Sequence, residues 1–198
     1  LSMLNVPQLN NRLFDVLDQA DDPERLVFAV RLLGLRNADG AEERFRSMIE
    51  EEGSSRTLRK ACMKALESLG TLQTCQALAD FILQEDPLKR DAQRSLKRLC
   101  LNYGDPDVLW NKVFRPALES ASSDQVRQDL LAIADSVAGD TLMIYISELL
   151  EDPSSDLRPA AIKVLSRWPN MDAGEMWIKM ATVSGASAGD IKAAQTGL

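Results

Sequence analysis

The stretch Leu58-Arg59-Lys60-Ala61-Cys62-Met63-Lys64-Ala65-Leu66-Glu67-Ser68-Leu69 sets a pattern that the rest of the chain repeats. Its apolar or small residues fall at steps 0, 4, 7, 8 and 11, which places them on one side of an α-helix. The first positions of successive ladders are 32, 30, 38 and 31 residues apart, a period typical of stacked helical repeats. The five ladders are Leu26, Val30, Leu33, Gly34; Leu58, Cys62, Ala65, Leu66, Leu69; Leu88, Ala92, Ser95, Leu96, Leu99; Val126, Leu130, Ile133, Ala134, Val137; and Leu157, Ala161, Val164, Leu165, Trp168.

Each ladder is preceded by another amphipathic segment, so the chain reads as successive pairs of helices. A single pair cannot cover its own apolar stripe, whereas stacked pairs share one continuous core. We therefore expect an all-α, right-handed superhelix of about five pairs plus a partial sixth, forming a single domain over residues 1–198. The abrupt end of the sixth pair favours a segment of a longer protein. The expected repeats are 7–37, 41–70, 72–101, 105–138, 140–168 and, incomplete, 172–198.

Glycine and proline predict where this regular pattern is interrupted. Gly34 and Gly40 are expected to flank a turn after the first pair. Pro116 lies well inside the helix expected to run from Pro106 to about Ser120. An interior proline removes a backbone hydrogen bond and clashes with the preceding turn, so we expect a kink there.

Composition restricts the class of protein. The chain is 45% hydrophobic and 27% charged, which is typical of a globular protein with a sizeable core, and no apolar run is long enough to span a membrane. It contains no histidine and no CxxC pair among its three cysteines. No catalytic triad, phosphate-binding loop, metal site or cofactor site is therefore expected. The odd number of cysteines slightly favours a cytoplasmic location, with export of a longer parent protein as the alternative.

Four of the second helices begin with the same pattern, in which a capping residue is followed by an apolar residue and then by a base. The pattern stands at residues 54–59, 86–89, 124–127 and 152–158. This pattern resembles the HEAT family, including its short-repeat bacterial variety, from about residue 7 to residue 183. The resemblance is weakest in the first repeat, where Val27 stands in place of the base. It implies a helical solenoid whose second helices line a concave surface. It also implies a non-catalytic protein-interaction or scaffold module.

Charge is divided unequally between the two helices of each pair. The predicted first helices sum to −12 and the second helices to +7, within a net charge of −7. The cations on the solvent side of the second helices predict a groove for an acidic partner, either a protein, a peptide or a nucleic-acid backbone. The alternative is an ordinary solvated face balanced by neighbouring Asp and Glu, and the negative net charge disfavours nucleic acid. The candidate residues are Lys60, Lys64, Arg90, Arg94, Lys97 and Lys163.

Three further groups of residues are given structural interpretations. The bases that open the second helices are expected to pair with Asp of an adjacent repeat. Cys62 is expected to be a buried small apolar residue. The tryptophans invite comparison with HEAT-like DNA glycosylases, but Trp168 lies on an apolar ladder, which favours a place in the core. The bases are Arg59, Lys89, Arg127 and Arg158, and the other two tryptophans are Trp110 and Trp177.

Overall fold

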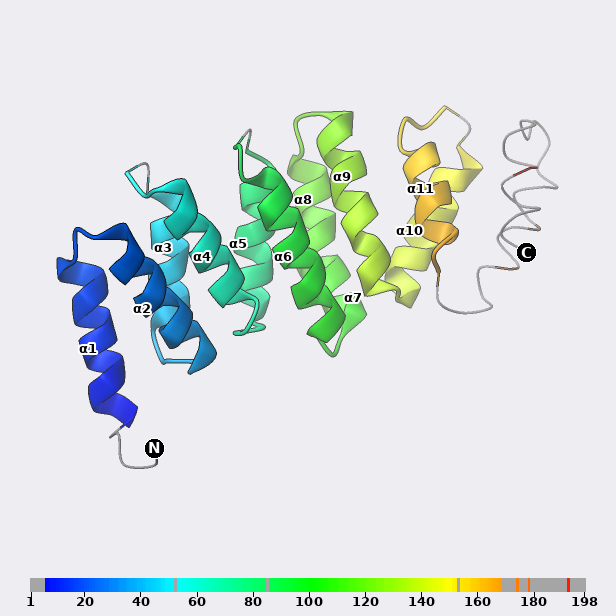
Figure 1. The fold of residues 1–198 in the computed structure, drawn as a ribbon. Coiled ribbons are helices and arrows are strands. Elements are labelled where there is room, and N and C mark those ends of the chain that lie inside the picture. The colour runs from blue at the N-terminus through cyan, green and yellow to red at the C-terminus, as the bar shows by residue number, and fades with distance from the viewer. Residues whose placement is uncertain are drawn as a thin grey trace. The chain divides into compact units, whose positions relative to one another are not determined.

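The computed structural model describes residues 6–51, 53–84, 86–152 and 154–168, together with positions 174, 178 and 192. Over these residues the chain is helical and contains no strand (Figure 1). It forms two compact units, Leu1–Asn102 and Tyr103–Leu198, each of which is described by itself. The predicted all-α fold of helical pairs is confirmed. The single domain stays a prediction, and the sixth repeat lies almost wholly outside the described residues.

Unit 1 contains three pairs of helices. Within each pair the first helix packs against the second: α1 on α2, α3 on α4 and α5 on α6. The second helices also contact one another, because α4 packs against both α2 and α6, and together they form one layer (Figure 1). The helices are α1 (Val6–Gln19), α2 (Pro23–Leu35), α3 (Ala41–Glu50), α4 (Arg56–Leu66), α5 (Leu72–Ile82) and α6 (Lys89–Asn102).

The predicted ladder forms the core of unit 1. On α6 every ladder position, including the hydroxyl residue Ser95, is buried, and on α4 every position is buried except the half-buried Leu69. Burying one such leucine contributes about 1.5–3 kcal/mol. In the first copy Leu26 is half-buried, whereas the next residue, Val27, is buried. The ladder is therefore least regular in the repeat where the sequence pattern is weakest.

Unit 2 repeats this construction with one irregularity. Helices α9 and α11 carry the ladders of the second helices, and their ladder residues are buried apart from the half-buried Trp168, which follows the end of α11. The elements are α7 (Pro106–Leu109), η1 (Trp110–Phe114), α8 (Arg115–Ser120), α9 (Asp124–Ala134), η2 (Asp135–Val137), α10 (Asp140–Glu151) and α11 (Arg158–Leu165).

The sequence predicts a helix irregularity at Pro116, and the structure has a π-helical turn immediately before this residue. In η1 the N–H of Arg115 donates to the carbonyl of Trp110, five residues back, and α7, η1 and α8 follow one another without a break. A proline in an α-helix has no N–H and crowds the carbonyl of the preceding turn. The wider π turn accommodates one extra residue before Pro116.

Side-chain caps begin the helices where the sequence predicts. The Ser55 hydroxyl accepts a hydrogen bond from the N–H of Leu58, and the Ser123 hydroxyl accepts one from the N–H of Val126. Such caps satisfy N–H groups of the first turn that have no partner within the helix. They start α4 and α9 at the residues that place each ladder toward the core.

Gly34 and Gly40 flank a turn as predicted, because α2 ends one residue after Gly34 and the Gly34 carbonyl accepts a hydrogen bond from the N–H of Asn37. Gly34 is also buried where α2 contacts α4. A Cβ atom at Gly34 would lie 2.7 Å from the Cβ and 3.1 Å from the Cα of Ala65. In the turn itself Asn37 and Gly40 have positive φ angles of 46° and 80°. Glycine is thus required at residue 34 by the close approach of two helices.

The variant Gly34→Ala should lower the free energy of unfolding by about 1–2 kcal/mol. Alanine favours the helix by about 1 kcal/mol, but overpacking against the Ala65 backbone costs more than this gain. The measurement is urea denaturation. Gly53→Ala is the matched control, because a Cβ there meets no atom within 4 Å. A Gly34→Ala protein as stable as the control would contradict the proposed close contact.

Candidate functional site

Positive charge in unit 1 is concentrated on the layer of second helices. Within their bounds α2, α4 and α6 contain eleven Lys and Arg against two Asp and Glu. Helices α1, α3 and α5 contain three Lys and Arg against six Asp and Glu. Helices α4 and α6 are adjacent, and we call six of their cations, the five that the sequence predicts and Arg98, the cationic surface. Its members are Lys60, Lys64, Arg90, Arg94, Lys97 and Arg98.

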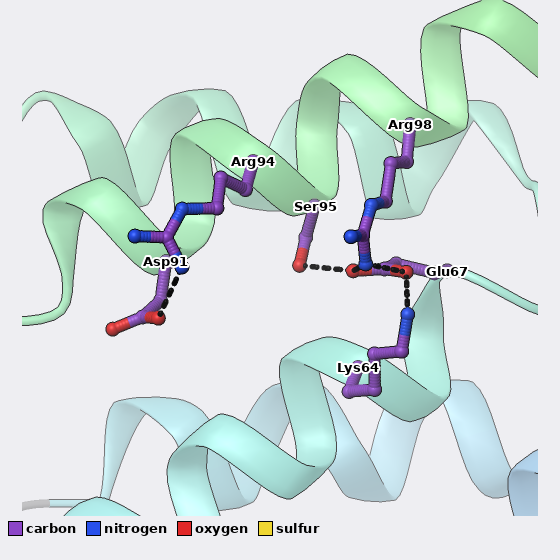
Figure 2. A network of polar contacts seen from close by, with 6 residues as sticks. All are labelled: Lys64, Glu67, Asp91, Arg94, Ser95 and Arg98. Atoms are coloured by element: carbon purple, nitrogen blue, oxygen red, sulfur yellow. Dashed lines mark hydrogen bonds and ion pairs between the residues drawn. The ribbon is translucent and has the colours of Figure 1, made fainter.

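Glu67, just after the end of α4, joins the two helices of the cationic surface (Figure 2). Its carboxylate accepts a hydrogen bond from the Ser95 hydroxyl at 2.8 Å and lies 3.1 Å from Nη1 of Arg98, both on α6. The ammonium group of Lys64 lies 2.5 Å from the same carboxylate. This carboxylate is therefore shared between a buried hydroxyl and two cations.

Asp91 forms a second acidic point on the surface. Its carboxylate lies 3.0 Å from Nζ of Lys60 on α4. It also lies 3.7 Å from Nη1 of Arg94 on α6 (Figure 2). Three of the predicted cations, Lys60, Lys64 and Arg94, thus have an acidic neighbour. Counting Glu67 and Asp91 against the six cations, the surface keeps a net charge of +4.

The structure brings five of the six predicted residues together on α4 and α6. Arg90 is exposed and Lys97 is half-buried. Lys163 is exposed on α11 and so belongs to unit 2. Sequence reasoning missed Arg98, although its position four residues after Arg94 places it on the same side of α6.

Arg59 is structural rather than part of this surface. Its Nε donates to the carbonyl of Ile49 at 2.7 Å, and its Nη2 lies 2.7 Å from the carboxylate of Asp86 in the next repeat. The guanidinium also lies over the ring of Phe81, 5.2 Å from its centre. The predicted pairing with an adjacent-repeat Asp is confirmed for Arg59. Burial alone would raise the pKa of Asp86, but the Leu88 N–H and the Arg59 guanidinium hold it below its usual range.

The equivalent arginines of unit 2 make the same kind of carbonyl contact as Arg59, but Arg127 has a different acidic partner. Arg127 pairs with Asp124 of its own helix at 2.6 Å, where an adjacent-repeat Asp was expected, and donates to the carbonyl of Ala121 at 3.1 Å. Arg158 donates to the carbonyl of Leu150 at 2.7 Å. As with Arg59, each arginine bonds a carbonyl at the end of the preceding first helix. Such carbonyls have no partner within their own helix, so these arginines act as caps.

The remaining candidate groups are buried. The Trp110 ring lies in the core of unit 2, with its centre 5.0 Å from that of Tyr145. Cys62 is buried, which raises the pKa of its thiol to about 12 and keeps it protonated. Cys75 and Cys100 are also buried, and a hydrogen bond between their thiols lowers the pKa of Cys75. Trp177 lies outside the residues whose side chains are described.

Neither a metal centre nor a membrane span is found in the part of the chain that the structure describes. Among these residues no three His, Cys, Asp or Glu side chains are grouped so that they could hold an ion. The described helices are all too short or too polar to cross a bilayer. The cationic surface is therefore the feature of the described residues on which a functional argument is built.

Comparison with known families identifies a match over unit 1. Residues 10–97 match a family model described as HEAT repeats. The matched stretch includes all of the cationic surface except Arg98, which is the next residue after its end. No curated protein matches the chain.

The variant Arg59→Lys should lower the free energy of unfolding by about 2 kcal/mol, because a single ammonium group cannot replace two charge-assisted hydrogen bonds. Urea denaturation measures the change. Arg90→Lys is the control: it alters an exposed side chain of the same type on the neighbouring helix and should change stability by less than about 0.5 kcal/mol. Equal effects of the two substitutions would show that Arg59 is not a cap.

The contribution of Asp86 to stability should depend on pH. Its pKa is held low in the folded state. Its stabilising effect is therefore present above the unfolded value of about 3.9 and is lost as the pH falls through the native pKa. The difference in unfolding free energy between the natural protein and Asp86→Asn should be largest near neutral pH and should shrink below about pH 4. A difference that grows on acidification would contradict this assignment.

Proposed function

Residues 10–97 of this chain are HEAT repeats, and on that premise we propose that the protein is a non-catalytic scaffold that binds a partner protein. HEAT repeats are commonly protein-interaction scaffolds, and the family is generally non-catalytic. The observation that supports a binding role here is the cationic surface, which has a net charge of +4 in a chain whose net charge is −7. Its partner is an acidic segment of another protein.

The ion pairs on the surface leave its cations accessible. The side chains of Lys64, Arg94 and Arg98 stay more than half exposed while they contact Glu67 or Asp91. The partner carboxylates of Glu67 and Asp91 are only 11% and 23% exposed, so they contact these cations from the protein side. Carboxylates of a binding partner can join these contacts from the solvent side. The positive field also accelerates the approach of an acidic partner.

The distribution of shifted pKa values supports a structural role for the other acidic groups. The Thr141 hydroxyl and N–H lower the pKa of Asp107, and the Ser154 hydroxyl and N–H lower that of Asp152. Like Asp86, these carboxylates accept backbone N–H groups near helix starts. Catalytic groups are more often shifted together within one cleft. This arrangement favours a scaffold over an enzyme.

A second candidate function, binding of nucleic acid, uses the same surface. It is favoured by the gathering of six cations on two adjacent helices. Nonspecific binding of nucleic acid depends on neutralising many phosphates at once. Glu67 and Asp91 lie among the cations and would repel a phosphate backbone. An acidic protein segment, whose carboxylates are spaced irregularly, avoids these two positions more readily.

Reversing two charges of the surface should remove partner binding. Fluorescence anisotropy at about 50 mM salt, a concentration at which charge screening is weak, would use a labelled Glu-rich peptide and a labelled DNA oligomer. We expect the peptide to bind saturably and the DNA oligomer not to bind. The double variant Lys60→Glu, Arg94→Glu should lose at least about tenfold in affinity for the peptide.

The matched control is Lys112→Glu, Arg115→Glu, which reverses two exposed cations of unit 2. Circular dichroism would verify that each variant is folded. Peptide binding that survives in Lys60→Glu, Arg94→Glu would eliminate the cationic surface as the site. Saturable DNA binding that is lost in the same variant would support the second candidate function instead.

A further inference from the structure

An exposed apolar stripe runs along α2, beside the cationic surface. The side chains of Phe28 and Leu35 are 62% and 77% exposed. Arg31 lies between them, and the spacing of three and four residues places all three on one side of the helix. The opposite side of α2 packs into the core through the ladder. This side of α2 therefore offers a partner two exposed apolar side chains with an arginine between them.

A groove of about 680 Å³ opens at one end of this stripe. It lies between the start of α2 and the start of α4 and is lined by Val27, Phe28 and Arg31 on one side and by Ser55 and Thr57 on the other. The buried side chain of Val27 gives it an apolar wall. The volume is enough to hold a large aromatic or aliphatic side chain.

The groove leads toward the cations of α4. Val27 lies across the groove from Thr57, and Gly34 contacts Ala65, so α2 and α4 run in the same direction (Figure 1). On α4 the exposed Thr57 is followed at three and seven residues by Lys60 and Lys64. Beyond the groove α2 thus presents exposed apolar side chains, and the next helix of the layer, α4, presents the cations Lys60 and Lys64, which pair with Asp91 and Glu67.

We propose that the groove and stripe form an anchor site for the partner segment. A bulky apolar side chain of that segment enters the groove against Val27 and Phe28, and the carboxylates that follow it lie on Lys60 and Lys64. This inference rests on the proposed function and specifies its partner as an acidic segment with an aromatic or leucine anchor.

The charges and the apolar area together favour this occupant. Glu24 at the rim of the groove repels an anion at that point, whereas it tolerates an uncharged side chain. Arg31 at the groove and the exposed Lys60 and Lys64 on α4 attract carboxylates. A nucleic acid could stack a base on Phe28, but its phosphate backbone offers no group to cover Leu35. An acidic segment with an apolar anchor meets both requirements.

Three labelled peptides test the anchor site by fluorescence anisotropy on the whole chain. One is Glu-rich with a central Trp, the second replaces the Trp by Ser, and the third replaces the Glu by Gln. The first should bind at least about tenfold more tightly than either of the others. Phe28→Ala should remove the advantage of the Trp peptide over the Ser peptide and leave binding of the Ser peptide unchanged.

Ile144→Ala is the matched control, because Ile144 is 60% exposed on α10 of unit 2. It should leave the affinity for all three peptides unchanged. Equal binding of the Trp and Ser peptides would overturn the anchor site while the scaffold function stands on the cationic surface. No binding of either Glu-rich peptide to the folded protein would overturn both. A DNA oligomer that binds and loses affinity in Phe28→Ala would assign the site to nucleic acid.

Discussion

The structure depends on the burial of one apolar stripe on each second helix. In unit 1 the stripes of α2, α4 and α6 are covered by the paired first helix and by the neighbouring second helices. Because a helix has 3.6 residues per turn, a stripe turned inward leaves the opposite steps in solvent. The same constraint that forms the core therefore collects Lys60, Lys64, Arg90 and Arg94 on one side. The cationic surface is a consequence of how the core is built.

Polar contacts between neighbouring repeats also fix the position of one first helix against the next. Glu42 on α3 accepts hydrogen bonds from the hydroxyls of Thr71 and of Thr74, the second at 2.5 Å, at the start of α5. Asp107 accepts bonds from both the hydroxyl and the N–H of Thr141 in unit 2. In both units an acidic side chain of one first helix thus holds the start of the next. The acidic residues that make these contacts belong to first helices, whereas the second helices of unit 1 contain an excess of Lys and Arg.

The proposed binding role follows from the contrast between α4 and α2. The outer residues of α4 and α6 include the six cations, whereas those of α2 include Phe28 and Leu35. Close contact between α2 and α4, which requires glycine at residue 34, brings these two kinds of surface against each other. A partner that covers both needs apolar and acidic groups in one segment. The buried surface area alone would not select such a partner. Specificity comes from complementary charges placed beside a buried apolar contact.

The repeat period by itself determined the helical pairs and most of the ladder residues of the core, and together with the charge of the second helices it predicted five of the six cations of the surface, because helical periodicity is a local property of the chain. Only the tertiary structure decided the rest. The role of Gly34, the capping of Ile49 by Arg59, the contact of Cys75 with Cys100 and the groove beside Phe28 each depend on residues from different helices. Such contacts are set by the distance and register between packed helices, which local spacing does not encode.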